Sequence, residues 1–300
     1  MQKLIIDTDP GQDIDDLLAI VFALHRPELD IRAITTVTYP SDLRARLIKR
    51  LLRYVDRTDI PVGAGMQYPL RPMSEWDLKQ QHDLAVSMNH KCFAEPEDPQ
   101  DDPGDVDAVD LIIRTVEDNA GEIALACIAP LTNIACALRK KPEIARKISY
   151  IALMGGEMRN NQREHNVAFD YIASDIVFRS GIPLYVGTWS VTRQFALSMD
   201  DCDRFRKHES PLYRALGHSI DAWHPAQSWK PGPVMYDIFP IVWAFDRSYY
   251  TTEHRSIRVE TKGEFTSGMT VYHGDVPNAH VTTDIRAAEL RALYFSTLFG

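Results

Sequence analysis

Short apolar runs rich in β-branched residues alternate with amphipathic helical patterns along most of the chain. Strands are predicted at 3–9, 31–37, 61–65, 122–129, 148–154 and 183–187, and helices at 15–24, 41–55, 107–117 and 172–180. This alternation is typical of βαβ units, whose strands run parallel. We therefore expect an α/β fold with an open, mostly parallel, doubly wound sheet flanked by helices.

The remaining segments are less regular. Residues 67–106, rich in Pro, Asp, Glu and Met, show no clear period and predict a long irregular excursion. Residues 201–245 predict mainly helix, 256–261 and 269–272 predict a small late β-hairpin, and 283–298 predict a closing helix. Because the 300 residues contain no repeat or linker, we expect one domain spanning residues 1–300.

The charge balance limits the partners. Acidic residues outnumber basic ones by 42 to 33, and the net charge of -9 argues against nucleic acid, which needs a basic face. A small neutral or cationic ligand, or a metal, fits better. The first apolar run meets a carboxylate after three residues, no run is long enough to span a membrane, and the four cysteines form no C-x-x-C pair. We expect a soluble, cytoplasmic protein.

Residues 7–16 read DTDPGQDIDD and place five carboxylates at a predicted strand-to-helix junction. Ligands of parallel α/β sheets bind at the carboxyl ends of strands, where this junction lies. One or two of these acids could cap the helix, with Asp13 as the natural N-cap. Five like charges need a neutralising cation, and oxygen ligands without nearby His or Cys favour Ca²⁺ or Mg²⁺.

The DTDPG motif, followed by Asp-Asp and an apolar helix, resembles the fingerprint of the inosine–uridine preferring nucleoside hydrolase family. Similar segments follow in the family's order: PVGAG at 61–65, APLTNIACAL at 129–138, LMGG at 153–156, EHN at 164–166 and GPVMYD at 232–237. The resemblance spans almost the whole chain. It implies a homo-oligomeric enzyme that uses Ca²⁺ to hydrolyse the N-glycosidic bond of ribonucleosides, giving free base and ribose.

The resemblance also implies roles for individual residues. The expected Ca²⁺ ligands are Asp9, Asp16, Asp237 and the backbone carbonyl of Ile128, with Asp13 as a further candidate. Asp15 would be the general base that takes a proton from the metal-activated water. Ribose hydroxyls would be bound by Glu164, Asn166 and either Asn160 or Asn161.

The chain departs from the family pattern in the acidic turn. Gln12-Asp13-Ile14 makes the turn two residues longer than the usual D-P-G-x-D-D. Counting forward from Pro10 makes Asp13 the general base, whereas counting back from the helix makes it Asp15. We prefer Asp15, because this register preserves the Asp-Asp pair.

The chain also departs from the family pattern at the residues expected to contact the leaving base. Met235 and Tyr236 stand where many members carry a His that protonates the leaving base, and Pro40 occupies the position of a usual Asn. Tyr236 would be either a proton donor, although a phenol with a pKa near 10 is a poor acid, or an aromatic wall. Trp223 and Trp229 are candidates for stacking on the base. Purine or aryl leaving groups are therefore expected to react better than pyrimidines.

Two rival functions remain. A haloacid-dehalogenase-like phosphatase also begins with a strand and D-x-D, but Pro10-Gly11 follows here and no later acid pair is suitably placed. The second rival is a Ca²⁺-dependent nucleoside- or sugar-binding member of the same family that has lost turnover. The missing His and the lengthened turn favour this second rival.

Overall fold

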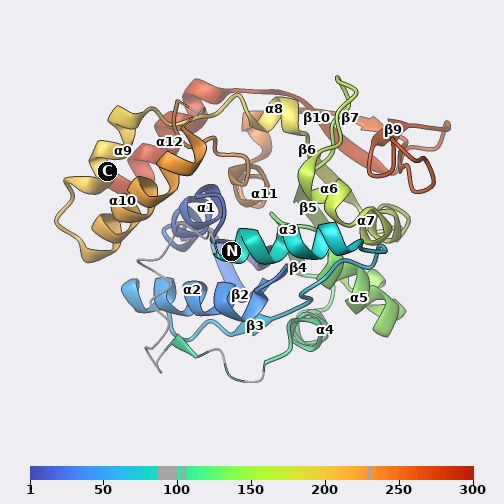
Figure 1. Cartoon of the computed structure of the whole chain (residues 1–300), viewed down its shortest axis with the longest axis horizontal. Coiled ribbons are helices and arrows are strands. Elements are labelled where there is room, and N and C mark those ends of the chain that lie inside the picture. Colours follow the sequence, from blue (N-terminus) through green and yellow to red (C-terminus); the bar gives the residue numbers. More distant parts are fainter. Residues whose placement is uncertain (87–100, 103, 105, 229–230) are drawn as a thin grey trace.

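A computed structural model describes residues 1–86, 101–102, 104, 106–228 and 231–300 of the chain. Its centre is an eight-stranded sheet with the strand order β3-β2-β1-β4-β5-β6-β10-β7. All neighbouring strands are parallel except β10 and β7, which are antiparallel. Helices cover both faces of the sheet (Figure 1). The predicted fold class is confirmed, as is the small late hairpin, formed by β8 and β9.

The strands are β1 (Gln2–Thr8), β2 (Leu29–Thr36), β3 (Val62–Ala64), β4 (Ile123–Cys127), β5 (Ile148–Met154), β6 (Leu184–Gly187), β7 (Tyr250–Arg255), β8 (Ile257–Val259), β9 (Thr270–Tyr272) and β10 (Ala279–Ile285). The α-helices are α1 (Asp15–Leu24), α2 (Ser41–Tyr54), α3 (Glu75–Val86), α4 (Ala108–Asp118), α5 (Thr132–Lys140), α6 (His165–Phe169), α7 (Tyr171–Phe178), α8 (Trp189–Thr192), α9 (Met199–Arg206), α10 (Pro211–Trp223), α11 (Ile238–Trp243) and α12 (Ala287–Phe299). Short 3-10 helices are η2 (Pro142–Arg146), η3 (His224–Gln227) and η4 (Arg247–Tyr249).

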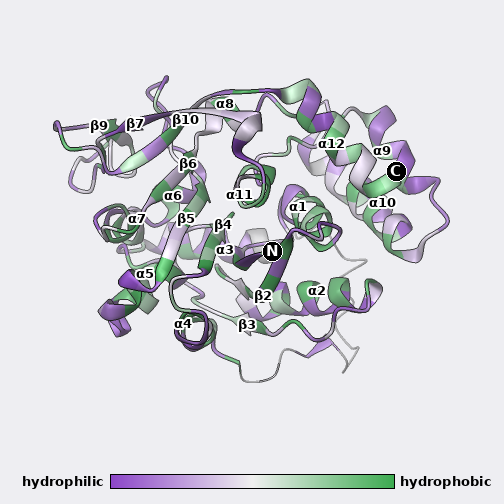
Figure 2. Cartoon of the chain, turned by 180° about the vertical axis from the view of Figure 1, so that it is seen from behind, coloured by the Kyte–Doolittle hydropathy of each residue, from purple (hydrophilic) through white to green (hydrophobic). Residues whose placement is uncertain are grey.

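The sheet separates two hydrophobic cores. Successive side chains of a strand point to opposite faces, so Leu4 and Ile6 of β1 join one core while Ile5 joins the other. The first core includes residues of α1, α2 and α9 to α12, and the second includes residues of α4, α5 and α7. Figure 2 shows hydrophobic residues concentrated on the central strands and on α1, with hydrophilic residues along the outer helices and loops.

Two predictions of local structure were wrong. The segment 67–106 contains the helix α3, whose surface-exposed Trp76 and Leu78 leave no apolar stripe to reveal its period. The closing helix was placed too early, because Ala279–Ile285 forms β10 and α12 begins at Ala287. Strand β7 also gave no signal, since it lies at the sheet edge and is largely polar and exposed.

The chain reverses its winding between β1 and β4. From β1 it moves outward through β2 and β3, then returns to place β4 on the other side of β1. In open α/β sheets, this switch point leaves a crevice at the carboxyl ends of the two strands. Asp9 follows β1 and Ile128 follows β4, so both lie at this crevice.

Asn133 on α5 links the elements beside the switch point. Its buried carboxamide donates to Asp7 Oδ1 at 2.8 Å and to the Thr36 carbonyl at 2.9 Å. Its Oδ1 accepts from the Met66 N–H at 2.9 Å. One side chain therefore satisfies polar groups of β1, β2 and the segment after β3.

Asn133→Leu should destabilise the protein by about 2–4 kcal/mol, because it removes three hydrogen bonds, two of them to buried acceptors, while keeping the side-chain volume. Urea unfolding measures the loss. Asn119→Leu is the matched control, since the buried amide of Asn119 donates one bond, to the Thr115 carbonyl at 2.9 Å. Equal losses in the two variants would contradict the linking role of Asn133.

Candidate active site

Three buried carboxylates meet where β1 passes into α1. Asp15 and Asp16 lie in the first turn of α1, and Asp237 is the N-cap residue of α11. One oxygen atom of each lies within 4.8 Å of those of the other two. Asp237 makes no side-chain capping bond, so its carboxylate is not engaged as an ordinary helix cap. The tertiary fold thus joins acids that are more than 200 residues apart.

The acids on either side of this triad have different surroundings. The Asp9 carboxylate lies outside the triad and accepts from the Thr38 hydroxyl at 3.3 Å, while the Asp9 N–H donates to Asp16 Oδ1 at 3.1 Å. Asp13 is half-buried, and its Oδ1 accepts from the adjacent Ile14 N–H at 2.9 Å. Ile14, rather than Asp13, is the N-cap residue of α1.

Burial makes ionisation of these acids costly. It raises the pKa of Asp16 to about 6, although bonds from the Thr8 hydroxyl and the Asp9 N–H counteract this rise. Burial, followed by repulsion from Asp15, raises the pKa of Asp237 well above its usual range. A divalent cation would relieve both effects, and an all-oxygen ligand set suits a hard cation. The residues present therefore fit a metal ion.

Arg44 on α2 holds the acidic loop in place. Its buried guanidinium donates to the carbonyls of Asp9 and Pro10, the latter at 2.7 Å. It also donates to the carbonyls of Thr38 and Tyr39, both at 3.3 Å. All four acceptors are backbone oxygens, so Arg44 ties the loop after β1 to the loop after β2 while placing a positive charge near Asp9 and Asp16.

A cavity of about 360 Å³ opens over the triad. It contains most of the residues that the sequence singled out, together with several that it did not. The lining residues are Asp9, Gln12, Asp13, Asp15, Asp16, Ile128, Met154, Glu164, His165, Asn166, Trp189, Gln227, Tyr236 and Asp237.

Glu164 and Asn166 form the wall opposite the acidic loop. Gly156, with φ of 76°, allows the tight turn after β5. The Glu164 carboxylate accepts from the N–H groups of Gly156, Asn166 and Val167 at 2.8 to 3.0 Å, and so caps α6. Asn166 Nδ2 donates to the Met154 carbonyl at 3.2 Å. These bonds hold both side chains at the cavity in one orientation.

Asn160 and Asn161 lie away from this wall. Both are exposed, and neither lines the cavity. The Asn160 N–H donates to Glu157 Oε1 at 3.1 Å, so Asn160 belongs to a turn beside the cavity. Of the residues expected to bind ribose, the structure brings Glu164 and Asn166 to the cavity.

The aromatic residues are distributed differently from the expectation. Tyr236 lines the cavity, whereas Trp223 is fully buried in the first core and is therefore a packing residue. Trp229 lies outside the described residues. Trp189, just after β6, is a half-buried aromatic of the cavity that sequence reasoning missed. Its position at the carboxyl end of a parallel strand was the available signal.

His165, Gln12 and Gln227 were also missed. His165 is the middle residue of the EHN segment, and only the outer two residues of this segment were predicted to bind ribose. It is exposed at the cavity, between two buried neighbours. Gln12 belongs to the lengthened turn, and Gln227 to η3. No motif marks either of these two glutamines.

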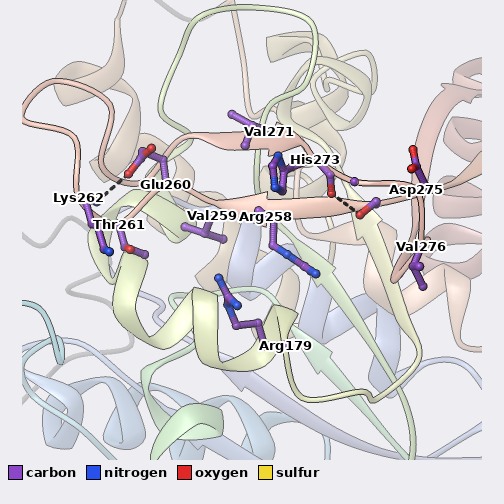
Figure 3. Close-up of a pocket in the computed structure, with 12 residues that line it drawn as sticks. Arg179, Arg258, Val259, Glu260, Thr261, Lys262, Val271, His273, Asp275 and Val276 are labelled. Atoms are coloured by element: carbon purple, nitrogen blue, oxygen red, sulfur yellow. Dashed lines mark hydrogen bonds between the residues drawn. The ribbon is translucent and has the colours of Figure 1, made fainter.

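A second hollow, of about 550 Å³, lies under the β8–β9 hairpin (Figure 3). Arg179, Arg258, Lys262 and His273 are among its lining residues. Arg179 is already paired with Asp175 at 2.6 Å. Since this hollow is open and holds no cluster of buried acids among its lining residues, the cavity over the triad is the better candidate for catalysis.

Comparison with known proteins identifies the family. Residues 4–292 match the model of the inosine-uridine preferring nucleoside hydrolases. The chain belongs to this nucleoside hydrolase family. It is accordingly an N-glycosidase of the nucleoside hydrolase type, and the family resemblance seen in the motifs is confirmed.

Individual nucleoside hydrolases are similar over nearly their whole length. The pyrimidine-specific ribonucleoside hydrolase RihA of Escherichia coli O9:H4 (strain HS) is 33% identical over 297 residues, covering 94% of this chain and 93% of RihA. The purine-preferring ribonucleoside hydrolase from Gardnerella vaginalis has a TM-score of 0.86 at 25% identity, covering 99% of this chain and 98% of that one. The plant nucleoside hydrolase PpNRh1 has a TM-score of 0.82 at 26% identity, with the same coverage.

One finding bears on membranes. Among the helices that the structure describes, none is both long and apolar enough to cross a bilayer.

The raised pKa values generate a prediction about metal and pH. Without a cation, the contribution of Asp16 to stability is present below its unfolded pKa, near 3.8, and is lost as the pH rises through its folded pKa of about 6. A divalent cation binds the ionised carboxylates, so it should raise Tm more at about pH 8 than at about pH 5. Calorimetry with added Ca²⁺ or EDTA measures this difference. An increment that is equal at both pH values, or unchanged in Asp16→Asn, would contradict a metal site here.

Proposed function

We propose that the cavity over the triad hydrolyses the N-glycosidic bond of ribonucleosides, with Ca²⁺ held by Asp15, Asp16 and Asp237. The observation that carries this proposal is the meeting of three buried carboxylates within 4.8 Å at the carboxyl edge of the sheet. Ca²⁺ is preferred because it accepts more oxygen ligands than Mg²⁺ and tolerates irregular geometry. The carbonyl of Ile128, at the end of β4, would complete the ligand set.

The grouping of the acids favours Asp9 as the general base. The sequence assigned Asp9 to the metal and Asp15 to proton transfer, yet Asp15 belongs to the triad and Asp9 lies beside it. When bound, the cation would lower the pKa of a coordinated water and of the neighbouring carboxylates. Asp9 lines the same cavity, and the Thr38 hydroxyl and its own anchored backbone orient its carboxylate. It would accept the proton of the attacking water.

The opposite wall would bind the sugar. Glu164 accepts backbone N–H groups through both carboxylate oxygens, which fixes its side chain at the cavity. Asn166 is held by the Met154 carbonyl. A carboxylate and a carboxamide in fixed orientation suit the hydroxyls of a ribofuranoside. Asn160 could join them only through movement of its turn, so we retain Glu164 and Asn166.

The leaving-group side contains Tyr236, Trp189 and Gln227. No His directly precedes Asp237; the residue there is Tyr236, which lines the cavity, whereas Met235 is fully buried in the first core. Tyr236 therefore remains the candidate proton donor or aromatic wall. RihA is pyrimidine-specific by name and the Gardnerella protein is purine-preferring by name. Similarity alone therefore does not identify the nucleobase that this chain releases.

Location and assembly remain predictions from the sequence. We expect a cytoplasmic homo-oligomer with one domain per chain, acting on a small-molecule nucleoside and not on nucleic acid. The rival function is Ca²⁺-dependent nucleoside binding without turnover.

A panel of ribonucleosides, assayed for free ribose with and without EDTA, tests the function directly. We expect release of ribose that EDTA abolishes and Ca²⁺ restores, because the buried acids need the cation. Saturable binding of a nucleoside without release of its base would instead support the rival. Phosphate release from a phosphate ester would instead support the phosphatase hypothesis.

Two isosteric variants separate the roles of the acids. Asp9→Asn should lower kcat by about 10²- to 10⁴-fold, as expected for loss of a general base, while the Ca²⁺ content stays unchanged. Asp15→Asn should instead lower the Ca²⁺ content, with activity partly restored by excess Ca²⁺. Metal analysis beside steady-state kinetics measures both. The reverse pattern would return the base to Asp15, and loss of turnover in Asp13→Asn alone would move it to the inserted residues.

A further inference from the structure

His165 is a histidine at the cavity over the triad to which the proposed metal and sugar sites give no role. Of the ten histidines of the chain, His90 lies outside the described residues, and among the other nine only His165 lines this cavity. It begins α6 and is exposed, whereas Glu164 and Asn166 on either side of it are buried. The cavity therefore holds an imidazole that can meet both solvent and a bound ligand.

The His165 ring is available for proton transfer. It packs against the ring of Phe169, four residues further along the chain, at a centroid distance of 6.1 Å. Within the part of the chain that the structure describes, no hydrogen bond or ion pair engages its ring nitrogens. An exposed imidazole of this kind can take up a proton from water and pass it to a ligand.

The neighbours of His165 place it close to a bound sugar. Glu164 and Asn166 are the residues proposed to bind ribose, and their hydrogen bonds to the turn after β5 fix the backbone on both sides of His165. A cavity of about 360 Å³ is near the lower limit for a ligand pocket, so a bound nucleoside would contact most of its lining. The base is attached to the same ribose ring and lies within range of the imidazole.

Carboxylates predominate among the charged groups that face His165. An adjoining cavity of about 140 Å³, which His165 also lines, adds two arginines that are already engaged. Arg44 donates to four backbone carbonyls, and Arg71 donates to the Phe169 carbonyl at 2.7 Å and to Asp77 at 3.0 Å. An imidazolium therefore meets attraction rather than repulsion here. The other titratable residues of the two linings are the carboxylates of Asp9, Asp13, Asp15, Asp16, Glu164 and Asp237 and the phenols of Tyr39 and Tyr236.

We propose that His165 is the general acid that protonates the leaving base, a role for which the chain lacks a His before Asp237. This inference rests on the proposed nucleoside hydrolysis. An imidazole, with an ordinary pKa of about 6.5, is a far better proton donor at neutral pH than a phenol, with an ordinary pKa of about 10. Tyr236, in the same cavity, would then contact the base without transferring a proton.

The proposed step transfers two protons in opposite directions. The oxygen of the attacking water bonds to C1′ of the ribose, and Asp9 accepts a proton from that water. The C1′–N bond breaks, and its electron pair goes to the base. His165 gives its proton to a ring nitrogen of the base, which leaves neutral. Solvent then returns a proton to His165 and removes one from Asp9, so that one water is consumed for each bond broken.

His165→Gln tests this role, because it keeps a polar side chain and removes the titratable ring. The substrates are inosine and 4-nitrophenyl riboside, whose leaving phenolate is stable without a proton. We expect kcat for inosine to fall by about 10²- to 10³-fold, whereas kcat for the aryl riboside stays within about threefold. Tm should not change, because His165 is exposed. His218→Gln, exposed on α10, is the matched control and should leave both rates unchanged.

The pH profile gives a second readout that a structural role would not move. In the wild-type protein, kcat for inosine should decline as the pH rises through the titration of an imidazole, because only the protonated ring donates. This decline should be absent in His165→Gln, and absent in the wild-type protein with the aryl riboside.

Two outcomes overturn the acid role alone. Equal losses on both substrates would make His165 a residue that binds the sugar. Unchanged kinetics with inosine in His165→Gln would remove it from the reaction, and a loss in Tyr236→Phe would then assign the proton to the phenol. If the wild-type protein cleaves neither riboside, the proposed function fails and this inference fails with it.

Discussion

Repulsion among buried carboxylates is the constraint around which the carboxyl edge of the sheet is built. Asp15, Asp16 and Asp237 lie within 4.8 Å of one another with little exposure to water, an arrangement that costs free energy unless a positive charge compensates it. Their surroundings supply only part of that compensation. The Thr8 hydroxyl and the Asp9 N–H stabilise Asp16, and Arg44 adds a nearby positive charge. The remaining deficit supports the proposed cation site at this edge.

Arg44 and Asn133 stabilise the same region by different means. Arg44 donates to four backbone carbonyls of two loops. Its guanidinium is therefore held without a hydrogen bond to any carboxylate of the triad. Asn133 pairs with a carboxylate, a carbonyl and an N–H of three separate segments. Both side chains are buried and come from helices on opposite faces of the sheet. The acids are therefore held in position from both sides before any ligand binds.

The proposed sugar side and base side of the site differ in origin. Glu164 and Asn166 are fixed by hydrogen bonds to the turn after β5, which is part of the sheet edge. The proposed base side is assembled from segments outside the sheet: α8, η3 and the loop before α11. The family motifs lie around the acids and the proposed sugar side, whereas the departures from the family pattern lie on the proposed base side.

The sequence by itself determined the α/β class, the mostly parallel sheet and the family. The class follows from local information, because strand and helix periods extend over a few residues. The family follows from motifs that resemble it over almost the whole chain. The cluster of five carboxylates singled out Asp9, Asp15 and Asp16, and the family resemblance added Glu164 and Asn166. The sequence did not reveal α3, β7 or β10, which lack an apolar stripe or gain their burial from neighbouring strands.

Only the tertiary structure decided which acids meet. Asp15 directly precedes Asp16 and Asp9 lies seven residues before it, but spacing alone does not show which of them meets Asp237. The packing of α11 against α1 brings Asp237 to Asp15 and Asp16 and leaves Asp9 beside the triad. The tertiary structure likewise buried Trp223 in the core and brought His165 to the cavity that Asp9 also lines. Local patterns show what a residue can do chemically. Contacts between distant segments decide what it can reach, because they depend on how the two faces of the sheet are packed.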